Sequence, residues 1–270
     1  MLIYDTPLWS IVDTAWYLSF YPVVRALAES DDETTLTSVY MRYGRQLGHS
    51  PNPLFHEMWY LQQNPDVRQT VQGGGLASGF EHYRAFGCAE RPPHWLFRPS
   101  HYEREFNTKY QRAFDPELDG NIYDHFLRLG QFQGLSGHWL FDAGVYEALS
   151  DYETIQSIRR KGPYATYVSR LGLVYQEGTT THFFDPHWYL AAYPQVSQGI
   201  DDGIWTSALE HYLSNQAPLN FDPTPIFSES AYCMAYEDVR TAIAQNAIRN
   251  GYEHYLLCGR HENRPFFGRG

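Results

Sequence analysis

The sequence contains few of the residues that would place it in several common classes of protein. Its 270 residues include only three cysteines, Cys88, Cys233 and Cys258. An odd number of widely spaced cysteines does not make a disulfide framework, and the lack of a CxxC pair removes the usual zinc signature. We expect free thiols, with a single Cys233–Cys258 bridge as the alternative.

The given sequence also shows no long apolar run, no signal-peptide pattern and no excess of positive charge. No apolar stretch approaches the roughly 18 residues that a membrane-spanning helix needs. The first residues carry Asp5 where a signal peptide has positive charge, and no small-residue cleavage site follows. The net charge of −11 argues against a nucleic-acid partner, because phosphate contacts need a basic face. We therefore expect synthesis in the cytoplasm, so that work outside the cell would need another export route.

Aromatic residues, in contrast, are abundant. The chain has 22 Tyr, 16 Phe and 7 Trp, and its 43% hydrophobic content is typical of a globular protein. A tyrosine recurs every 42 to 44 residues, at Tyr17, Tyr60, Tyr102, Tyr146, Tyr189 and Tyr232. A phenylalanine lies five residues before each of the last five, at Phe55, Phe97, Phe141, Phe184 and Phe227.

A second block follows in phase with these tyrosines. It is clearest at residues 80–87, 209–216 and 252–259, which begin FEHY, LEHY and YEHY, and weaker at 38–44, 123–130 and 165–172. Two blocks in phase predict stacked supersecondary units. The period of about 43 residues is too long for tetratricopeptide or ankyrin repeats. We bound six copies at residues 1–54, 55–96, 97–140, 141–183, 184–226 and 227–270.

Each copy has the start and stop signals of short helices. Asp185 is a suitable N-cap before Pro186, and Asn64 before Pro65 gives the same signal. The recurring glycine, as in Gly87, fits a left-handed residue at a helix end. We expect helices over 59–64, 188–193 and 231–236, with glycines 87, 130, 172 and 259 at helix ends. The predicted fold is an all-α tandem repeat, elongated or curved, because one unit cannot bury its own apolar face.

The two blocks together resemble a known bacterial repeat. Residues 184–196 read FDPHWYLAAYPQV and are followed by Leu209-Glu-His-Tyr212, which is similar to the pattern FDxxWYLxxNPDV…HYxxxGxxEGRxP. The second half of the pattern is present as Gly87–Pro93 and as Gly259–Pro265, with Asn263 where glycine is usual. The resemblance covers nearly all of the chain but is partial in copies one, three and four. Such repeats occur beside glycosyltransferases and in surface-associated proteins of alphaproteobacteria, which implies a setting of bacterial surface polysaccharide.

A chain made only of these repeats also resembles an accessory head spike of the phage-like gene transfer agents of these bacteria. Such spikes adsorb to capsular polysaccharide. This resemblance implies release in a phage-like particle, or another association with the cell surface, and other proteins of that assembly as partners.

The residues shared between copies are expected to be structural. Side chains kept at fixed phase are what packing between units requires, so the six tyrosines are expected in the core. His82, His125, His211 and His254 lie one per copy, so stacking would set them in a row. A hydrogen bond to a neighbouring unit is therefore favoured over metal or acid–base chemistry. No catalytic residue, metal site or cofactor is predicted.

Tryptophans that differ between copies are the candidate ligand contacts. Trp205 lies in the variable segment of copy five beside Asp201 and Asp202, and Trp95 and Trp139 follow His94 and His138 in matching loops. An exposed indole can stack on a sugar ring while nearby polar groups bond its hydroxyls. The alternative for the loop pair is that they cover the joints between copies.

The sequence thus predicts a non-enzymatic protein that binds bacterial surface polysaccharide, neutral or mildly charged. A structural scaffold that binds other proteins through the same face is one alternative. An accessory module of a glycosyltransferase system is another.

Overall fold

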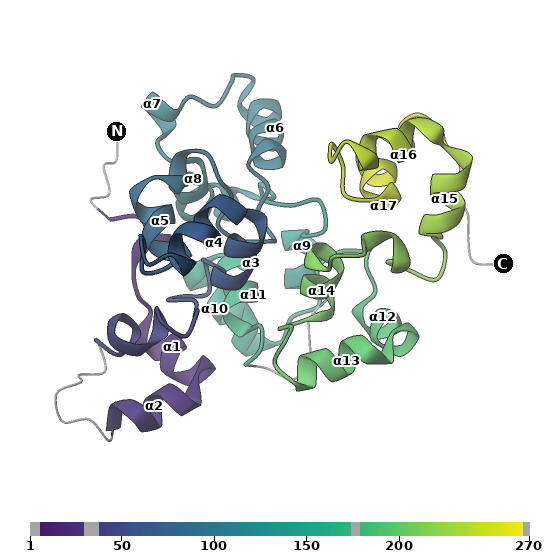
Figure 1. Cartoon of the computed structure of the whole chain (residues 1–270). Coiled ribbons are helices and arrows are strands. Elements are labelled where there is room, and N and C mark those ends of the chain that lie inside the picture. The colour runs from purple at the N-terminus through teal and green to yellow at the C-terminus, as the bar shows by residue number, and fades with distance from the viewer. Residues whose placement is uncertain (1–5, 30–37, 174–178, 267–270) are drawn as a thin grey trace. The chain divides into compact units, whose positions relative to one another are not determined.

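The computed structural model describes residues 6–29, 38–173 and 179–266. Within these ranges the chain forms helices and no strand, which confirms the predicted all-α class (Figure 1). Short 3₁₀ or π-helical turns lie between some of the longer helices. Their bounds are α1 Thr14–Phe20, α2 Pro22–Glu29, α3 Glu57–Gln63, α4 Pro65–Gln72, α5 Gly79–Ala85, α6 Pro99–Tyr110, α7 Pro116–Asp119, α8 Ile122–Arg128, α9 Ala143–Ala148, α10 Tyr152–Lys161, α11 Pro163–Arg170, α12 Pro186–Ala192, α13 Pro194–Asp201, α14 Ala208–Ser214, α15 Glu229–Ala235, α16 Glu237–Ala244 and α17 Gly251–His254.

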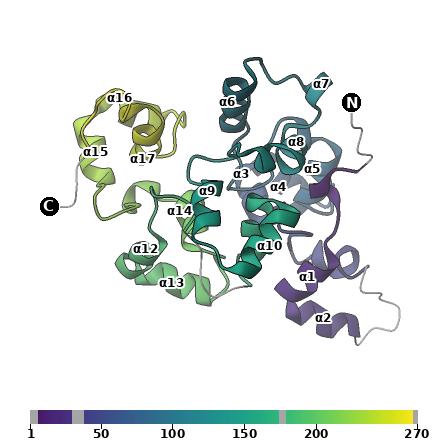
Figure 2. The same ribbon diagram turned by 180° about the vertical axis from the view of Figure 1, so that it is seen from behind.

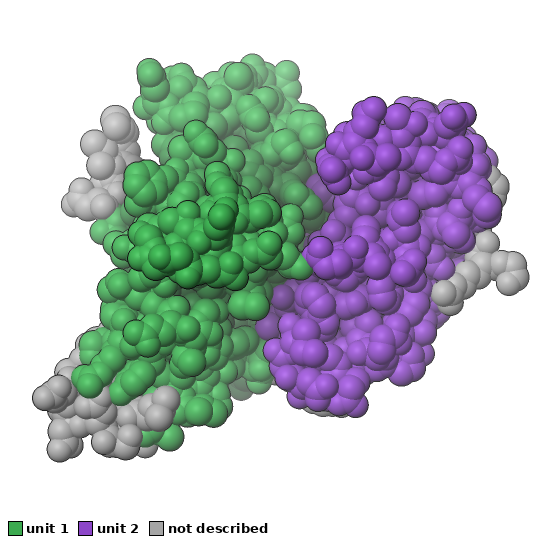
Figure 3. All heavy atoms as spheres, viewed as in Figure 1, with its two compact units in different colours: residues 1–138, 150–175 green, residues 139–149, 176–270 purple. Residues whose placement is uncertain are grey.

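The chain divides into two compact units (Figure 3). Unit 1 comprises residues 1–138 and 150–175, and unit 2 comprises 139–149 and 176–270. The division cuts through the segment 141–183, which the sequence predicts to be one copy. Helix α9 belongs to unit 2, whereas α10 and α11 belong to unit 1.

Three-helix groups recur in both units. Helices α3, α4 and α5 contact one another in unit 1, as do α12, α13 and α14 in unit 2, and the ribbon views show both groups (Figures 1 and 2). The predicted helices at 59–64, 188–193 and 231–236 are present, but each begins two residues earlier. The side chain of Asp185 accepts a hydrogen bond from the Trp188 amide at 3.0 Å, so Asp185 is the N-cap that the sequence predicts. Asn64, in contrast, makes no side-chain cap for α4.

The six in-phase tyrosines are buried, between 0% and 5% exposed. In four copies the tyrosine hydroxyl lies beside a glycine, in the pairs Tyr17–Gly44, Tyr60–Gly87, Tyr102–Gly130 and Tyr232–Gly259. A Cβ atom at any of these glycines would overlap the hydroxyl or its ring. The expected left-handed conformation is found at Gly172, with φ +69°, but not at Gly87, Gly130 or Gly259. At those three positions glycine is required by the close approach of the tyrosine.

Backbone hydrogen bonds close each of the first four copies on itself. The amide of the residue that precedes or caps the first helix bonds a carbonyl 37 to 39 residues later, at 2.7–3.1 Å. The pairs are Asp13–Pro51, His56–Pro93, Arg98–Gly137 and Asp142–Thr180. In each case the loop that leads into the next copy is held against the start of its own copy.

A buried glutamate joins the first and third helices in two copies. Glu57, 1% exposed, accepts hydrogen bonds from the amides of Gly79 and Phe80 at 2.5 and 2.9 Å. Glu229, 0% exposed, bonds the amides of Gly251 and Tyr252 in the same way at 2.8 and 3.0 Å. These carboxylates satisfy amides at a helix start that have no partner within the helix.

A second recurring bond joins the last residue of one copy to a tyrosine two copies further along the chain. The Tyr123 hydroxyl donates to the Leu54 carbonyl at 2.8 Å in unit 1, and the Tyr252 hydroxyl donates to the Phe183 carbonyl at 2.6 Å in unit 2. Both bonds span 69 residues, and the two tyrosines are 129 residues apart, or three periods of 43. The two units therefore share a contact between copies as well as the contacts within copies.

Candidate functional site

Trp205 lies on a tight turn that follows α13. Gly203 has φ +73°, and the Ile204 amide returns to bond the Gly199 carbonyl at 2.8 Å. The indole fits against Gly199, where a Cβ atom would lie 2.9 Å from Cδ1 of the ring. The His211 ring meets it edge-on, with centroids 5.2 Å apart. The ring is thus held in place, while the residue stays partly exposed.

The same turn occurs in two other copies without a tryptophan. The Gly75 amide bonds the Thr70 carbonyl, and the Ala247 amide bonds the Ala242 carbonyl, each at 2.9 Å. Leu76 and Ile248 stand one residue later, where copy five has Trp205. The turn is therefore a shared element, and its aromatic ring is specific to copy five.

Asp201, Asp202 and Ile204 precede Trp205 in the sequence and are all exposed. Asp202 accepts a hydrogen bond from Gln198 Nε2 at 3.0 Å, which leaves carboxylate oxygens of both aspartates open to solvent. An indole beside two carboxylates can stack on the apolar face of a sugar and accept bonds from its hydroxyls.

Three of the ligand contacts predicted in the matching loops, His94, Trp95 and His138, are wrong. Trp95 is 1% exposed, His94 3% and His138 0%, so none of them can contact a ligand at the surface. Burial lowers the pKa of both histidines well below the usual range. The His94 ring lies 4.9 Å from Trp95 and 6.1 Å from Tyr164 between centroids. Trp95 therefore packs at a joint inside unit 1. Trp139, like Trp205, is partly exposed, so it stays a predicted ligand contact.

The in-phase histidines bond a tyrosine of their own copy, not a neighbouring copy. Nδ1 lies 2.6–3.0 Å from the hydroxyl in the pairs Tyr60–His82, Tyr102–His125, Tyr189–His211 and Tyr232–His254. In copy one Val39 stands at the histidine position, and the Tyr17 hydroxyl instead lies 3.0 Å from Nδ1 of His49. Burial lowers the pKa of all five histidines. We therefore assign these histidines a role in packing within their own copies.

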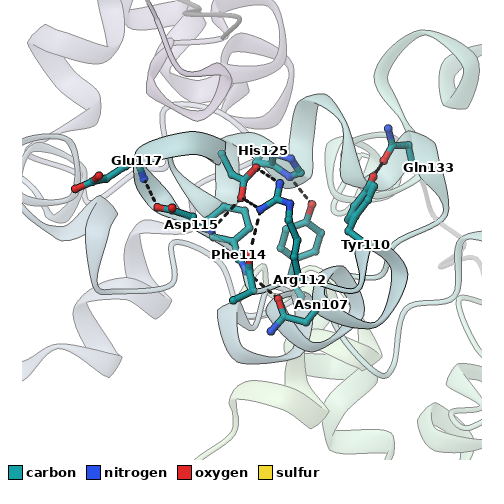
Figure 4. A network of polar contacts seen from close by, with 11 residues as sticks. Asn107, Tyr110, Arg112, Phe114, Asp115, Glu117, His125 and Gln133 are labelled. Carbon is teal, nitrogen blue, oxygen red and sulfur yellow. Dashed lines mark hydrogen bonds and ion pairs between the residues drawn. The ribbon is translucent and has the colours of Figure 1, made fainter.

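Copy three carries a polar network around His125 (Figure 4). Arg112 makes a two-pronged ion pair with Asp119, with N–O distances of 2.5 and 2.7 Å, and its guanidinium lies 4.7 Å from the centroid of Phe106. The Asn107 side-chain oxygen accepts a hydrogen bond from the Phe114 amide at 2.9 Å. In copy three α6 continues through the positions of the NPDV turn, and these bonds fix residues 111–115, which connect α6 to α7. We therefore assign the network a structural role.

Two further ion pairs recur at equivalent positions. Arg91 pairs with Asp66 in copy two, and Arg264 pairs with Asp238 in copy six, each through two bonds of 2.7–3.0 Å. The arginine beside each aspartate lowers the carboxyl pKa to about 2. In copy five both partners are replaced, by Gln195 and Asn220. The aspartate and the arginine are thus absent together, which indicates that the ion pair connects the second helix of a copy to the loop that ends it.

The remaining features concern metals, thiols and membranes. Cys88, Cys233 and Cys258 are free thiols, as the sequence predicts. Among residues 6–29, 38–173 and 179–266, no group of three or more His, Cys, Asp or Glu side chains could hold a metal ion. In the same ranges no helix combines the length and apolar character needed to cross a membrane.

Comparison with models of protein families, with curated proteins and with solved structures finds no match. Function is therefore inferred from the chain's own residues, and the Trp205 turn is the candidate site that they leave at the surface.

Proposed function

We propose that this chain is a non-catalytic binding protein, built from six copies of a helical repeat of about 43 residues, that recognises bacterial surface or capsular polysaccharide. In this proposal it acts as a spike or adhesin of a phage-like particle, or in another assembly at the cell surface. The recurring Tyr–His and Tyr–Gly contacts and the closing bonds support the repeat. Because the shared residues are occupied in packing, recognition falls to residues that differ between copies.

The partly exposed Trp205 carries the proposal. It stands on a turn whose backbone is the same in three copies. Of these three, only copy five has an indole on the turn, preceded by two exposed aspartates. Stacking of aromatic rings contributes about 0.5–1.5 kcal/mol beyond the area buried. One such contact gives weak affinity, and display of many copies of the protein on one particle would raise it.

The test compares Trp205→Ala with Leu76→Ala, which truncates the equivalent residue of the same turn in copy two. Retention of the purified protein on capsule-bearing and capsule-free cells is measured for the parent and both variants. We expect Trp205→Ala to weaken a single site about ten-fold, from the stacking energy and the buried ring area together. Leu76→Ala should bind as the parent does. A folded Trp205→Ala variant that binds as well as the parent would place the contact elsewhere.

A scaffold that binds other proteins is the second candidate. It is favoured by strongly exposed apolar side chains in unit 1, among them Phe86, Leu118 and Tyr152 at 67%, 72% and 77%. Capsule-independent recovery of a defined protein partner, lost on Phe86→Ser, would support this candidate. If that partner were a glycosyltransferase, the accessory-module interpretation would follow.

A further inference from the structure

A pocket of about 330 Å³ lies in unit 1 between copies one and two. One wall comes from the π-helical turn Tyr40–Gly44 and Arg45 after it, and the other from α5 and Ser78 before it. Tyr40, Ser78 and Phe80 are buried and form the inner lining, whereas Arg45, Glu81 and Arg84 are nearer solvent. The volume is at the lower end of the range for small-molecule sites, which suits a single sugar ring.

The charge of this pocket is opposite to that of the chain. Arg45 and Arg84 both line it, and neither makes an ion pair within the described part of the chain. The Arg84 guanidinium lies 5.7 Å from the centroid of Phe80, which places the cation against the pocket's apolar base. The third charged group, Glu81, uses one oxygen to cap its own helix by accepting the Ala77 amide at 2.6 Å. Two arginines against one carboxylate leave a net positive pocket on a chain of charge −11.

Arg84 is also an exception among the copies. The equivalent positions in copies three, five and six are Leu127, Leu213 and Leu256, which are buried at 1%, 5% and 3%. In copy two this core position carries an exposed arginine instead, and in copy one it is Met41, which lines the same pocket. An exposed arginine at a position that is otherwise core gives up the stabilisation that burial of an apolar side chain provides. A ligand contact would account for an exposed arginine at a position where other copies have a buried leucine.

We propose that this pocket binds a carboxylated sugar, of the hexuronic acid class, within the polysaccharide that the chain recognises. The inference rests on the proposed function and specifies one unit of its ligand. Arginines hold carboxylates through paired charge-assisted hydrogen bonds, which a neutral sugar cannot form. Tyr40 forms part of the inner wall, and its hydroxyl is buried near Ser78 with no partner of good geometry among the described residues. A polysaccharide with one acidic sugar in each repeating unit is mildly charged, which also suits an acidic protein.

The experiment titrates the full chain with sodium glucuronate and, separately, with glucose, and follows backbone amide signals by NMR. Glucuronate should shift signals of residues 40–45 and 78–85, with affinity that falls as NaCl is added. Glucose should shift them at least ten-fold more weakly. Arg45→Gln combined with Arg84→Gln should weaken glucuronate binding at least ten-fold. Arg68→Gln, which changes an exposed arginine of α4 in the same unit, is the matched control and should leave binding unchanged.

The pocket assignment and the proposed function can fail separately. Equal binding of glucuronate and glucose, or a double variant that binds glucuronate like the parent, would overturn the pocket assignment. Retention on capsule-bearing cells that depends on Trp205 would then still support the proposed function. Conversely, if the parent protein is retained equally on capsule-bearing and capsule-free cells, the proposed function is overturned. Glucuronate binding that depends on both arginines would still support an acidic-sugar site.

Discussion

The Tyr60 hydroxyl occupies the space that a side chain at Gly87 would need, and it lies 2.9 Å from Nδ1 of His82. The Tyr60 hydroxyl thus requires glycine at position 87 and fixes the position of the His82 ring. The same arrangement is present at Tyr102, Gly130 and His125, and at Tyr232, Gly259 and His254.

Substitution of Gly87 by alanine tests this relationship directly. The added methyl group overlaps the hydroxyl, so Gly87→Ala should lower the free energy of unfolding by about 1–3 kcal/mol, as overpacking of a core does. Urea denaturation followed by circular dichroism measures the change. In a Tyr60→Phe background the obstructing oxygen is absent, so the same alanine should cost less. An equal cost in both backgrounds would show that the hydroxyl is not the obstacle.

Truncation of the in-phase tyrosines should be far more damaging than truncation of Trp205. Tyr189 and Tyr232 are fully buried, and Tyr→Ala at either should cost about 3–5 kcal/mol, in the range measured for large core aromatics. Trp205 is partly exposed, so Trp205→Ala should cost clearly less. Thermal unfolding of the three variants ranks them, and equal losses would contradict the distinction between core and surface rings.

Glu229 should make stability depend on pH. Its pKa is raised from 4.5 to about 8. Burial is the main cause and Asp222 adds to it, against the lowering effects of the Tyr252 and Gly251 amides and of Arg249. The folded protein therefore holds this proton more tightly than the unfolded chain does. Its contribution is fully present below about pH 4.5 and is lost as the pH rises to about 8, at about 1.4 kcal/mol for each pKa unit.

Glu229→Gln should accordingly flatten the decline in unfolding free energy between about pH 4.5 and pH 8. Denaturation curves across this range measure the slope. Glu237→Gln, at an exposed position in the first turn of α16, is the control and should keep the parental slope. A Glu229→Gln slope identical to the parent's would mean that Glu229 is already ionised near its ordinary pKa.

The Arg91–Asp66 bridge should contribute little to stability despite its good geometry. The Asp66 side chain is 63% exposed, and pairs of this kind contribute about 0–1 kcal/mol. Arg91→Gln should therefore cost no more than about 1 kcal/mol, and added salt should reduce that cost further. Chemical denaturation at low and high NaCl checks both points, and a cost of several kcal/mol would indicate a buried role for Arg91.

The helices and the buried tyrosines follow from local signals that the sequence displays. Asp185 before Pro186 marks a helix start because capping involves only neighbouring residues, and a tyrosine every 43 residues marks a core position. The burial of Trp95 could not be predicted in this way, because it depends on contacts such as that between His94 and Tyr164, 70 residues apart in the chain. The pocket was missed although its signal was present, since Arg84 interrupts a position that is leucine in three other copies.

The closing bonds from Asp13 to Pro51 and from His56 to Pro93 also bear on how the chain folds. Each joins residues fewer than 40 positions apart, so a copy can complete its own ring of contacts without waiting for distant segments. Low contact order of this kind is associated with fast folding in small domains. Under the proposed repeat, it also means that a whole copy can be gained or lost while the rings of the other copies stay closed.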